Sequence, residues 1–173
     1  MSNLFEQVGA LLLTLTIFLA GIFNPTLSES VSGMKISGTT TAAVVNVIDG
    51  DTIDVKMENI IDPVRVRYIG IDTPEPYAEG DPQCGSREAS VRNRELVADK
   101  VVTVVPGVDA YDKYGRLLAY VYVDDLFVNQ MLIAEGYARV MMIEPNTQYH
   151  SDFTKLYNNA HATKIGIWSE CGK

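Results

Sequence analysis

The sequence predicts an α+β domain in which five strands form a Greek-key β-barrel of the OB-fold type, accompanied by about three helices. Two observations lead to this class. Short β-branched segments bounded by turn residues occur five times in the chain. Together with the helical patterns they follow the order of three strands, one helix, two strands and further helices. That order is typical of the partly open five-stranded OB barrel.

The first three strands are expected at residues 43–47, 52–57 and 64–71. Asp49-Gly50, between the first two, is a strong hairpin-turn signal. In the second strand apolar and polar residues alternate, and the same parity directs Asp51 toward the apolar face. In the third strand Arg67 lies among apolar neighbours on the face opposite Val66. Buried positions therefore hold two charges that need partners.

The second half of the domain begins after a loop rich in proline and glycine, from Pro74 to Gly85. Ser86 is the expected N-cap of a helix that ends near Asp99. Two strands follow at residues 100–105 and 117–123, and a short helical pattern then closes at Gly136. The last helix shows apolar residues at i, i+3, i+4 and i+7, namely Phe153, Leu156, Tyr157 and Ala160.

The N-terminal region differs from the rest of the chain. An uncharged run of 16 residues extends from Val8 to Phe23, and a Ser/Thr/Gly-rich segment follows it. We expect residues 1–27 to be an export signal, with an uncleaved membrane anchor as the alternative. Residues 28–42 are then a flexible tether, and residues 43–173 form the barrel domain. On this interpretation the protein is secreted or extracytoplasmic, and any membrane contact is through residues 8–23.

Cysteine content and charge restrict the class of protein further. Cys84 and Cys171 fit an oxidising compartment if they pair, although the sequence does not fix their geometry. No CxxC or His-Cys spacing indicates a zinc site. The net charge of −8 opposes binding of a polyanion. A nucleic-acid substrate would therefore require a local basic pocket together with a metal ion.

Acidic residues at turns and strand ends suggest a site for a hard cation. Asp51 and Asp72 occupy the ends of two strands expected to be neighbours, which would bring both carboxylates within reach of one ion. For Asp49 local turn chemistry is the preferred explanation. Arg67 and Arg116 each have two interpretations, a structural ion pair or a bidentate clamp on a phosphate.

Three segments, VIDGDTIDV, VRYIGIDTPE and DKYGRLLAYVY, occur in this order and spacing, with GSREAS and GIWSE after the second and the third. In these motifs residues 43–170 resemble the staphylococcal nuclease family. The resemblance implies a calcium-dependent nuclease that cleaves DNA and RNA and leaves 3′-phosphate ends. A non-catalytic OB-fold module that binds nucleic acid or protein is the alternative. No protein partner is implied, and we expect a monomer.

The resemblance also implies roles for individual residues. Asp51 and Asp72 match the calcium carboxylates, with the backbone carbonyl of Thr73 as a further ligand. Glu75 matches the general base, and Arg67 and Arg116 match the arginines that stabilise the transition state. Lys113 and Tyr114 match residues at the phosphate end of the nucleotide. The sequence departs from the family where aromatic residues would contact the base, since this stretch reads Met141-Met142-Ile143-Glu144.

Overall fold

The computed structural model describes residues 36, 38–77 and 80–171. The predicted signal or anchor at 1–27, and most of the predicted tether, lie outside the described residues. Strand β1 already begins at Thr40, inside the segment predicted as tether. Within the described ranges, no helix is both long enough and apolar enough to cross a membrane.

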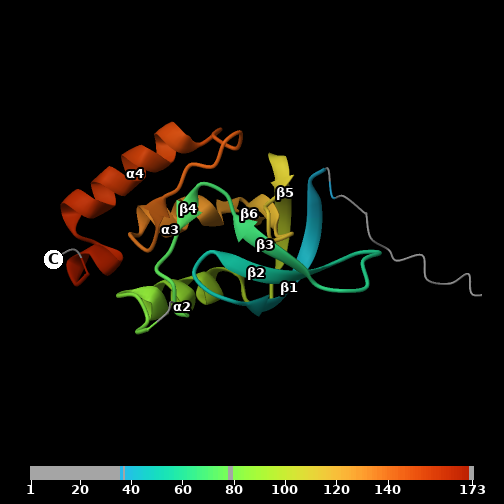
Figure 1. Cartoon of the computed structure of the whole chain (residues 1–173), viewed down its shortest axis with the longest axis horizontal. Helices are drawn as coiled ribbons and strands as arrows, with labels where there is room; N and C mark the ends of the chain where they lie inside the picture. Colours follow the sequence, from blue (N-terminus) through green and yellow to red (C-terminus); the bar gives the residue numbers. More distant parts are fainter. Residues whose placement is uncertain (1–35, 37, 78–79, 172–173) are drawn as a thin grey trace, which may run out of the picture. The chain divides into compact units, whose positions relative to one another are not determined.

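Five main strands close into a barrel (Figure 1). They are β1 (Thr40–Val47), β2 (Thr52–Met57), β3 (Val64–Tyr68), β5 (Val101–Tyr111) and β6 (Leu117–Val123). Their order in the sheet is β3-β2-β1-β5-β6, and a parallel pairing of β3 with β6 joins the two ends. The other pairings among these strands are antiparallel. The predicted five-stranded OB barrel is confirmed.

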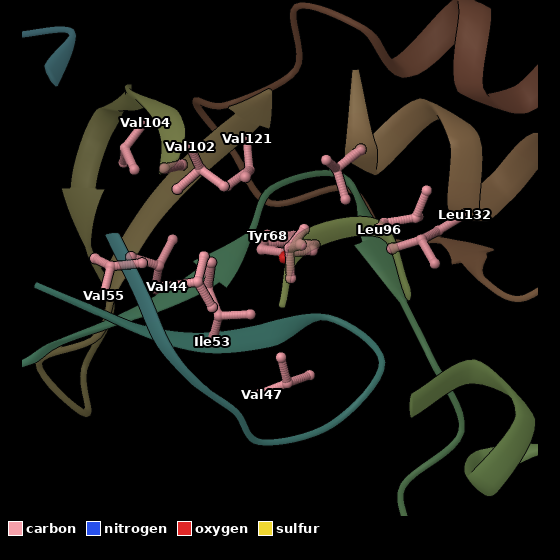
Figure 2. Close-up of a cluster of buried hydrophobic side chains, with 14 of the residues drawn as sticks. Val44, Val47, Ile53, Val55, Tyr68, Leu96, Val102, Val104, Val121 and Leu132 are labelled. Atoms are coloured by element: carbon pink, nitrogen blue, oxygen red, sulfur yellow. The ribbon is translucent and has the colours of Figure 1, made fainter. Parts of the chain in front are cut away.

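The barrel interior is filled by the inward-facing residues of these strands. Strand β2 shows the alternation, because Ile53 and Val55 are fully buried while Lys56 is exposed. Burying each large aliphatic side chain contributes about 1.5–3 kcal/mol. Figure 2 shows part of this core, with residues Val44, Val47, Ile53, Val55, Tyr68, Leu96, Val102, Val104, Val121 and Leu132 labelled.

Within the described residues three α-helices accompany the barrel, as the sequence predicts. They are α2 (Ser86–Val97), α3 (Val128–Ala134) and α4 (His150–Thr163), with a 3₁₀ turn η1 at Gly166–Ser169. The helix α2 packs on β1, and α3 packs on β6 and on α4 (Figure 1). Three short strands complete the fold, namely β4 (Ile71–Asp72), β7 (Leu126–Phe127) and β8 (Arg139–Val140).

The prediction of Ser86 as the N-cap of α2 is wrong. Gly85 is the N-cap, with φ of 83°, and Ser86 is the first helical residue and buried. A Cβ at Gly85 would lie 2.5 Å from the Ile167 side chain. Glycine is therefore required here for two reasons, the left-handed backbone and the close approach of η1.

The third strand is shorter than predicted. Residues 64–71 divide into β3, which ends at Tyr68, and β4, which pairs with β8 and not with β2. The break lies at Gly70, where φ is 82° and a Cβ would meet the Phe153 ring at 2.8 Å. Because only glycine fits this turn readily, the chain changes direction just before Asp72.

Strand β5 is longer than the predicted strand at 100–105 and continues through Pro106 to Tyr111. The pairing with β6 changes register between these two residues. Asn146 supports this irregular part, since its side chain accepts a hydrogen bond from the Asp109 N–H and donates one to the Asp109 carbonyl. This side-chain support from a distant segment cannot be seen in the local sequence pattern.

Candidate active site

Arg67 lies at the centre of a charged cluster on the outer face of β3. Its side chain is 7% exposed, and Nε lies 3.1 Å from Asp51 Oδ1. The Nη1 group donates to the carbonyls of Tyr68 and Ile71, and Nη2 donates to Asp72 Oδ1 at 3.1 Å. One guanidinium thus holds both carboxylates that the sequence predicted to converge. Of the two interpretations of Arg67, the structural ion pair is present.

The open side of this guanidinium is Nη2. Besides Asp72, it contacts Met141 Sδ at 3.7 Å. Both partners are partly exposed, Asp72 with 42% of its side chain and Met141 with 40% of the residue. Thioether sulfur is a weak acceptor. Nη2 is thus the nitrogen with partly exposed partners, whereas Nε and Nη1 are committed to buried acceptors.

The turn that carries Asp51 packs directly against the segment that follows β4. Asp51 Oδ2 accepts hydrogen bonds from the Thr73 N–H at 2.8 Å and from its hydroxyl at 3.0 Å. A Cβ at Gly50 would lie 2.6 Å from Thr73 Oγ1, so a larger residue would separate the two segments. The glycine of the Asp49-Gly50 turn thus permits the close approach that joins both halves of the site.

Asp49 serves the turn, as expected. Its Oδ1 accepts a hydrogen bond from the Asp51 N–H at 3.0 Å. Burial and the neighbouring charge of Asp51 raise the pKa of Asp49 to about 6. Burial likewise raises the pKa of Asp72, against the effect of Arg67. Several carboxylates crowd one arginine, which leaves an excess of negative charge.

Glu75 lies on the exposed loop after β4 and is held through its backbone. Its N–H donates to Gln83 Oε1 at 3.0 Å, and its carbonyl accepts from the Gln83 N–H at 3.1 Å. Partial burial and the charge of Asp51 raise the pKa of the Glu75 carboxyl, while Arg67 and Arg116 oppose the shift. The fields of both arginines therefore reach this carboxylate.

Arg116 stands at the start of β6, next to the exposed turn that carries Lys113 and Tyr114. Its Nε donates to Asp112 Oδ2 at 2.6 Å, and Asp112 Oδ1 accepts from the Tyr114 and Arg116 N–H groups. Burial alone would raise the pKa of Asp112, but these hydrogen bonds outweigh burial and lower the pKa. The Tyr114 ring is 72% exposed, with Lys113 Nζ 4.9 Å and Arg116 Cζ 5.5 Å from its centroid.

The donor set fits a hard cation. Calcium binds carboxylates, backbone carbonyls and water. Asp51 and Asp72 supply two carboxylates on one guanidinium, beside the Thr73 backbone and the excess negative charge. No group of three or more His, Cys, Asp or Glu side chains suited to a metal occurs in the described part of the chain. The predicted ligand set accordingly depends on a backbone oxygen and water.

Residues 65–170 match the model of the family described as staphylococcal nuclease homologue. The chain belongs to the staphylococcal nuclease family. The matched region contains Arg67, Asp72, Glu75 and Arg116, whereas Asp51 precedes it. The place of Asp51 in the site is therefore given by its contacts with Arg67 and Thr73.

Named relatives within the family are endonucleases and thermonucleases. The chain is 44% identical over 136 residues to the SPbeta prophage-derived endonuclease YokF of Bacillus subtilis. The aligned region covers 72% of this chain and 43% of that protein. The chain is 43% identical over the same length to endonuclease YncB of B. subtilis, of which it spans 60%. It is 34% identical over 143 residues to the thermonuclease of Staphylococcus hyicus, covering 80% of this chain and 81% of that protein.

Cys84 and Cys171 form a disulfide, with Cα atoms 5.7 Å apart. Cys84 directly follows Gln83, the residue that holds Glu75. The bridge therefore joins the base of the family's DTPE loop to the C-terminal segment. A persistent disulfide is typical of an oxidising compartment.

Besides Asn146, two further buried asparagines make contacts that were not predicted from the sequence. Asn93 donates to the Asp49 carbonyl and accepts from the Tyr68 hydroxyl, which joins α2 to the Asp49-Gly50 turn. Asn129 bridges the Ile69 carbonyl and the Val121 N–H. The signal for Asn93 was its place four residues after Ala89 on the buried face of a helix. A polar residue on such a face needs partners.

Proposed function

We propose that this chain is a calcium-dependent nuclease that hydrolyses phosphodiester bonds of DNA and RNA. The convergence of Asp51, Asp72 and Arg67 supports this proposal most directly, and the charges of Arg67 and Arg116 both act on the Glu75 carboxyl. The membership of the family and the endonuclease and thermonuclease names of the relatives support the reaction class.

Asp51, Asp72 and the Thr73 carbonyl would hold the calcium ion. When bound, calcium polarises a phosphate oxygen as a Lewis acid. Arg67 binds the phosphate through Nη2, and Arg116 binds it through its terminal nitrogens, since Nε is committed to Asp112. Preorganised cations of this kind stabilise the charge that develops on the phosphate in the transition state.

Glu75 orients the attacking water and accepts its proton. The new bond joins the water oxygen to phosphorus, and the bond from phosphorus to the 5′ oxygen breaks. The leaving oxygen takes up a proton, so the products are a 3′-phosphate and a 5′-hydroxyl end. Lys113 and the exposed Tyr114 lie beside Arg116 and would contact the nucleotide at its phosphate end.

The compartment belongs to the same proposal. The Cys84–Cys171 disulfide supports a secreted or extracytoplasmic location. In such a compartment calcium is abundant and thiols stay oxidised. The wider surface of an acidic chain repels nucleic acid, so we expect weak binding outside the site.

The test uses the full chain with end-labelled single-stranded DNA, in calcium and in chelator. We expect cleavage in calcium that leaves 3′-phosphate ends, and none in chelator. Glu75→Gln and Arg116→Ala should each lower the rate by about 10²- to 10³-fold. Lys155→Ala, on the exposed surface of α4, is the control that should cleave normally. A folded chain that cuts neither DNA nor RNA in calcium would overturn the proposal and leave a binding module.

A further inference from the structure

A row of charged residues crosses three neighbouring strands beside the proposed active site. Asp54 of β2 is opposite Arg65 of β3 in the antiparallel pairing. In the parallel pairing of β3 with β6, Val66 is opposite Leu117, which places the preceding residues, Arg65 and Arg116, side by side. Arg65 thus has a proposed catalytic arginine next to it on the adjoining strand.

Arg65 is also two residues before Arg67 on β3. Alternate residues of a strand share one face, so both side chains lie on the outer face, about 6.6 Å apart along the strand. The inward residue between them, Val66, is fully buried. Three arginines therefore lie near one another, Arg65 and Arg67 on the same face of β3 and Arg116 beside Arg65 at the start of β6.

The surroundings of Arg65 are open. Asp54, Arg65, Tyr114 and Arg116 line a depression of about 530 Å³. The Arg65 side chain is 51% exposed, and its guanidinium pairs with both oxygens of Asp54, at 2.9 Å and 3.1 Å. An exposed pair of this kind contributes only about 0–1 kcal/mol to stability. Stability alone is thus a weak reason for an arginine at this position.

The charges in the patch differ in how firmly they are held. Arg67 is buried between two carboxylates and two carbonyls, and Arg116 is tied to Asp112. Arg65 has a single carboxylate partner at the edge of an open depression. A guanidinium can exchange one bidentate anion for another, because carboxylate and phosphate present similar pairs of oxygens.

We propose that Arg65 binds a second backbone phosphate of the substrate, next to the phosphate held by Arg67 and Arg116. The intervening nucleoside lies over the exposed Tyr114 ring. Asp54 competes with this phosphate and weakens binding. This inference rests on the proposed function, and it makes the preferred substrate a strand with at least two consecutive phosphates rather than a single nucleotide.

Binding of a fluorescent single-stranded 12-mer to the full chain, measured by anisotropy in chelator, tests the inference without cleavage. Arg65→Ala should weaken binding by about 3- to 10-fold. It should also reduce the slope of log Kd against log salt by about 0.7, the effect of one lost phosphate contact on a single strand. Asp54→Asn should have the opposite sign and tighten binding. In calcium, Arg65→Ala should raise KM for the 12-mer with little change in kcat.

The matched controls are Lys155→Ala and Asp152→Asn, which remove the same charges from another exposed ion pair, on α4. If Lys155→Ala and Asp152→Asn change affinity and salt slope as much as Arg65→Ala and Asp54→Asn do, the inference is overturned, since only the net charge would then matter. A dinucleotide with one phosphate should be bound equally by Arg65→Ala and the unchanged protein. If the unchanged protein cleaves but Arg65→Ala matches the controls, the inference alone fails. If the unchanged protein neither binds nor cleaves, the proposed function fails with it.

Discussion

The proposed site is built from two regions that are held in different ways. Arg67 lies on a barrel strand, is buried, and uses three nitrogens on four protein acceptors. Glu75 lies on an exposed loop, and the structure fixes its backbone through Gln83. Substitutions in the barrel region are therefore expected to lower both activity and stability. Substitutions in the loop region are expected to lower activity alone. Substitutions in each region can break or sharpen this contrast.

Arg67→Ala should have the largest effect. It leaves Asp51, which is 1% exposed, without its cation, and loss of one partner of a buried pair costs about 3–5 kcal/mol. Cleavage should fall by at least about 10²-fold as well. Urea unfolding and the cleavage rate in calcium measure the two effects. Glu75→Gln should lose similar activity but change the free energy of unfolding by less than about 0.5 kcal/mol.

The control for Arg67→Ala is Arg65→Ala, on the same strand and face but in an exposed pair. It should cost less than about 1 kcal/mol of stability. Asp51→Asn with Arg67→Met removes both buried charges and should recover part of the lost stability. A stability of Arg67→Ala equal to that of Arg65→Ala would show that burial of the ion pair does not make the barrel region sensitive to substitution.

Removal of the disulfide is the next largest change. Cys84→Ser with Cys171→Ser opens a link between residues 87 apart in sequence, and should lower the free energy of unfolding by about 2–4 kcal/mol. The rate per folded molecule should fall less than tenfold, because both hydrogen bonds between Gln83 and the Glu75 backbone remain. Reduction of the unchanged protein should lower its unfolding midpoint equally, and the serine variant should not respond. A midpoint insensitive to reductant would argue against any role of the bridge in holding this loop.

The sequence predicted the barrel well because its signals are local. Alternation located β2, and Asp49-Gly50 located the first turn. The misjudged features depend on distant residues. The break at Gly70 makes room for Phe153, and the second half of β5 is supported by Asn146.

The site was predictable only in part for the same reason. The pattern showed that Asp51 and Arg67 each need a partner, but strand parity placed them on opposite faces, since Ile53 is opposite Val66. Only the fold shows that they pair with each other. The nearness of Arg65 to Arg116 follows from the parallel pairing of β3 with β6, between strands about 50 residues apart, and no local pattern encodes it. The carboxylate roles came from the family resemblance rather than from spacing.

Gln83→Ala should have the smallest effect and tests the loop region most directly. It removes the side-chain acceptor of the Glu75 N–H, a contact worth about 0.5–1.5 kcal/mol, so kcat should fall about 2- to 10-fold with KM little changed. Gln130→Ala, an exposed glutamine of α3, is the control that should leave kcat unchanged. Because Gln83 acts through Glu75, adding Gln83→Ala to Glu75→Gln should cost no further activity. A full additional loss in the double variant would mean that Gln83 contributes independently of Glu75, and the loop would then hold more of the site than one carboxylate.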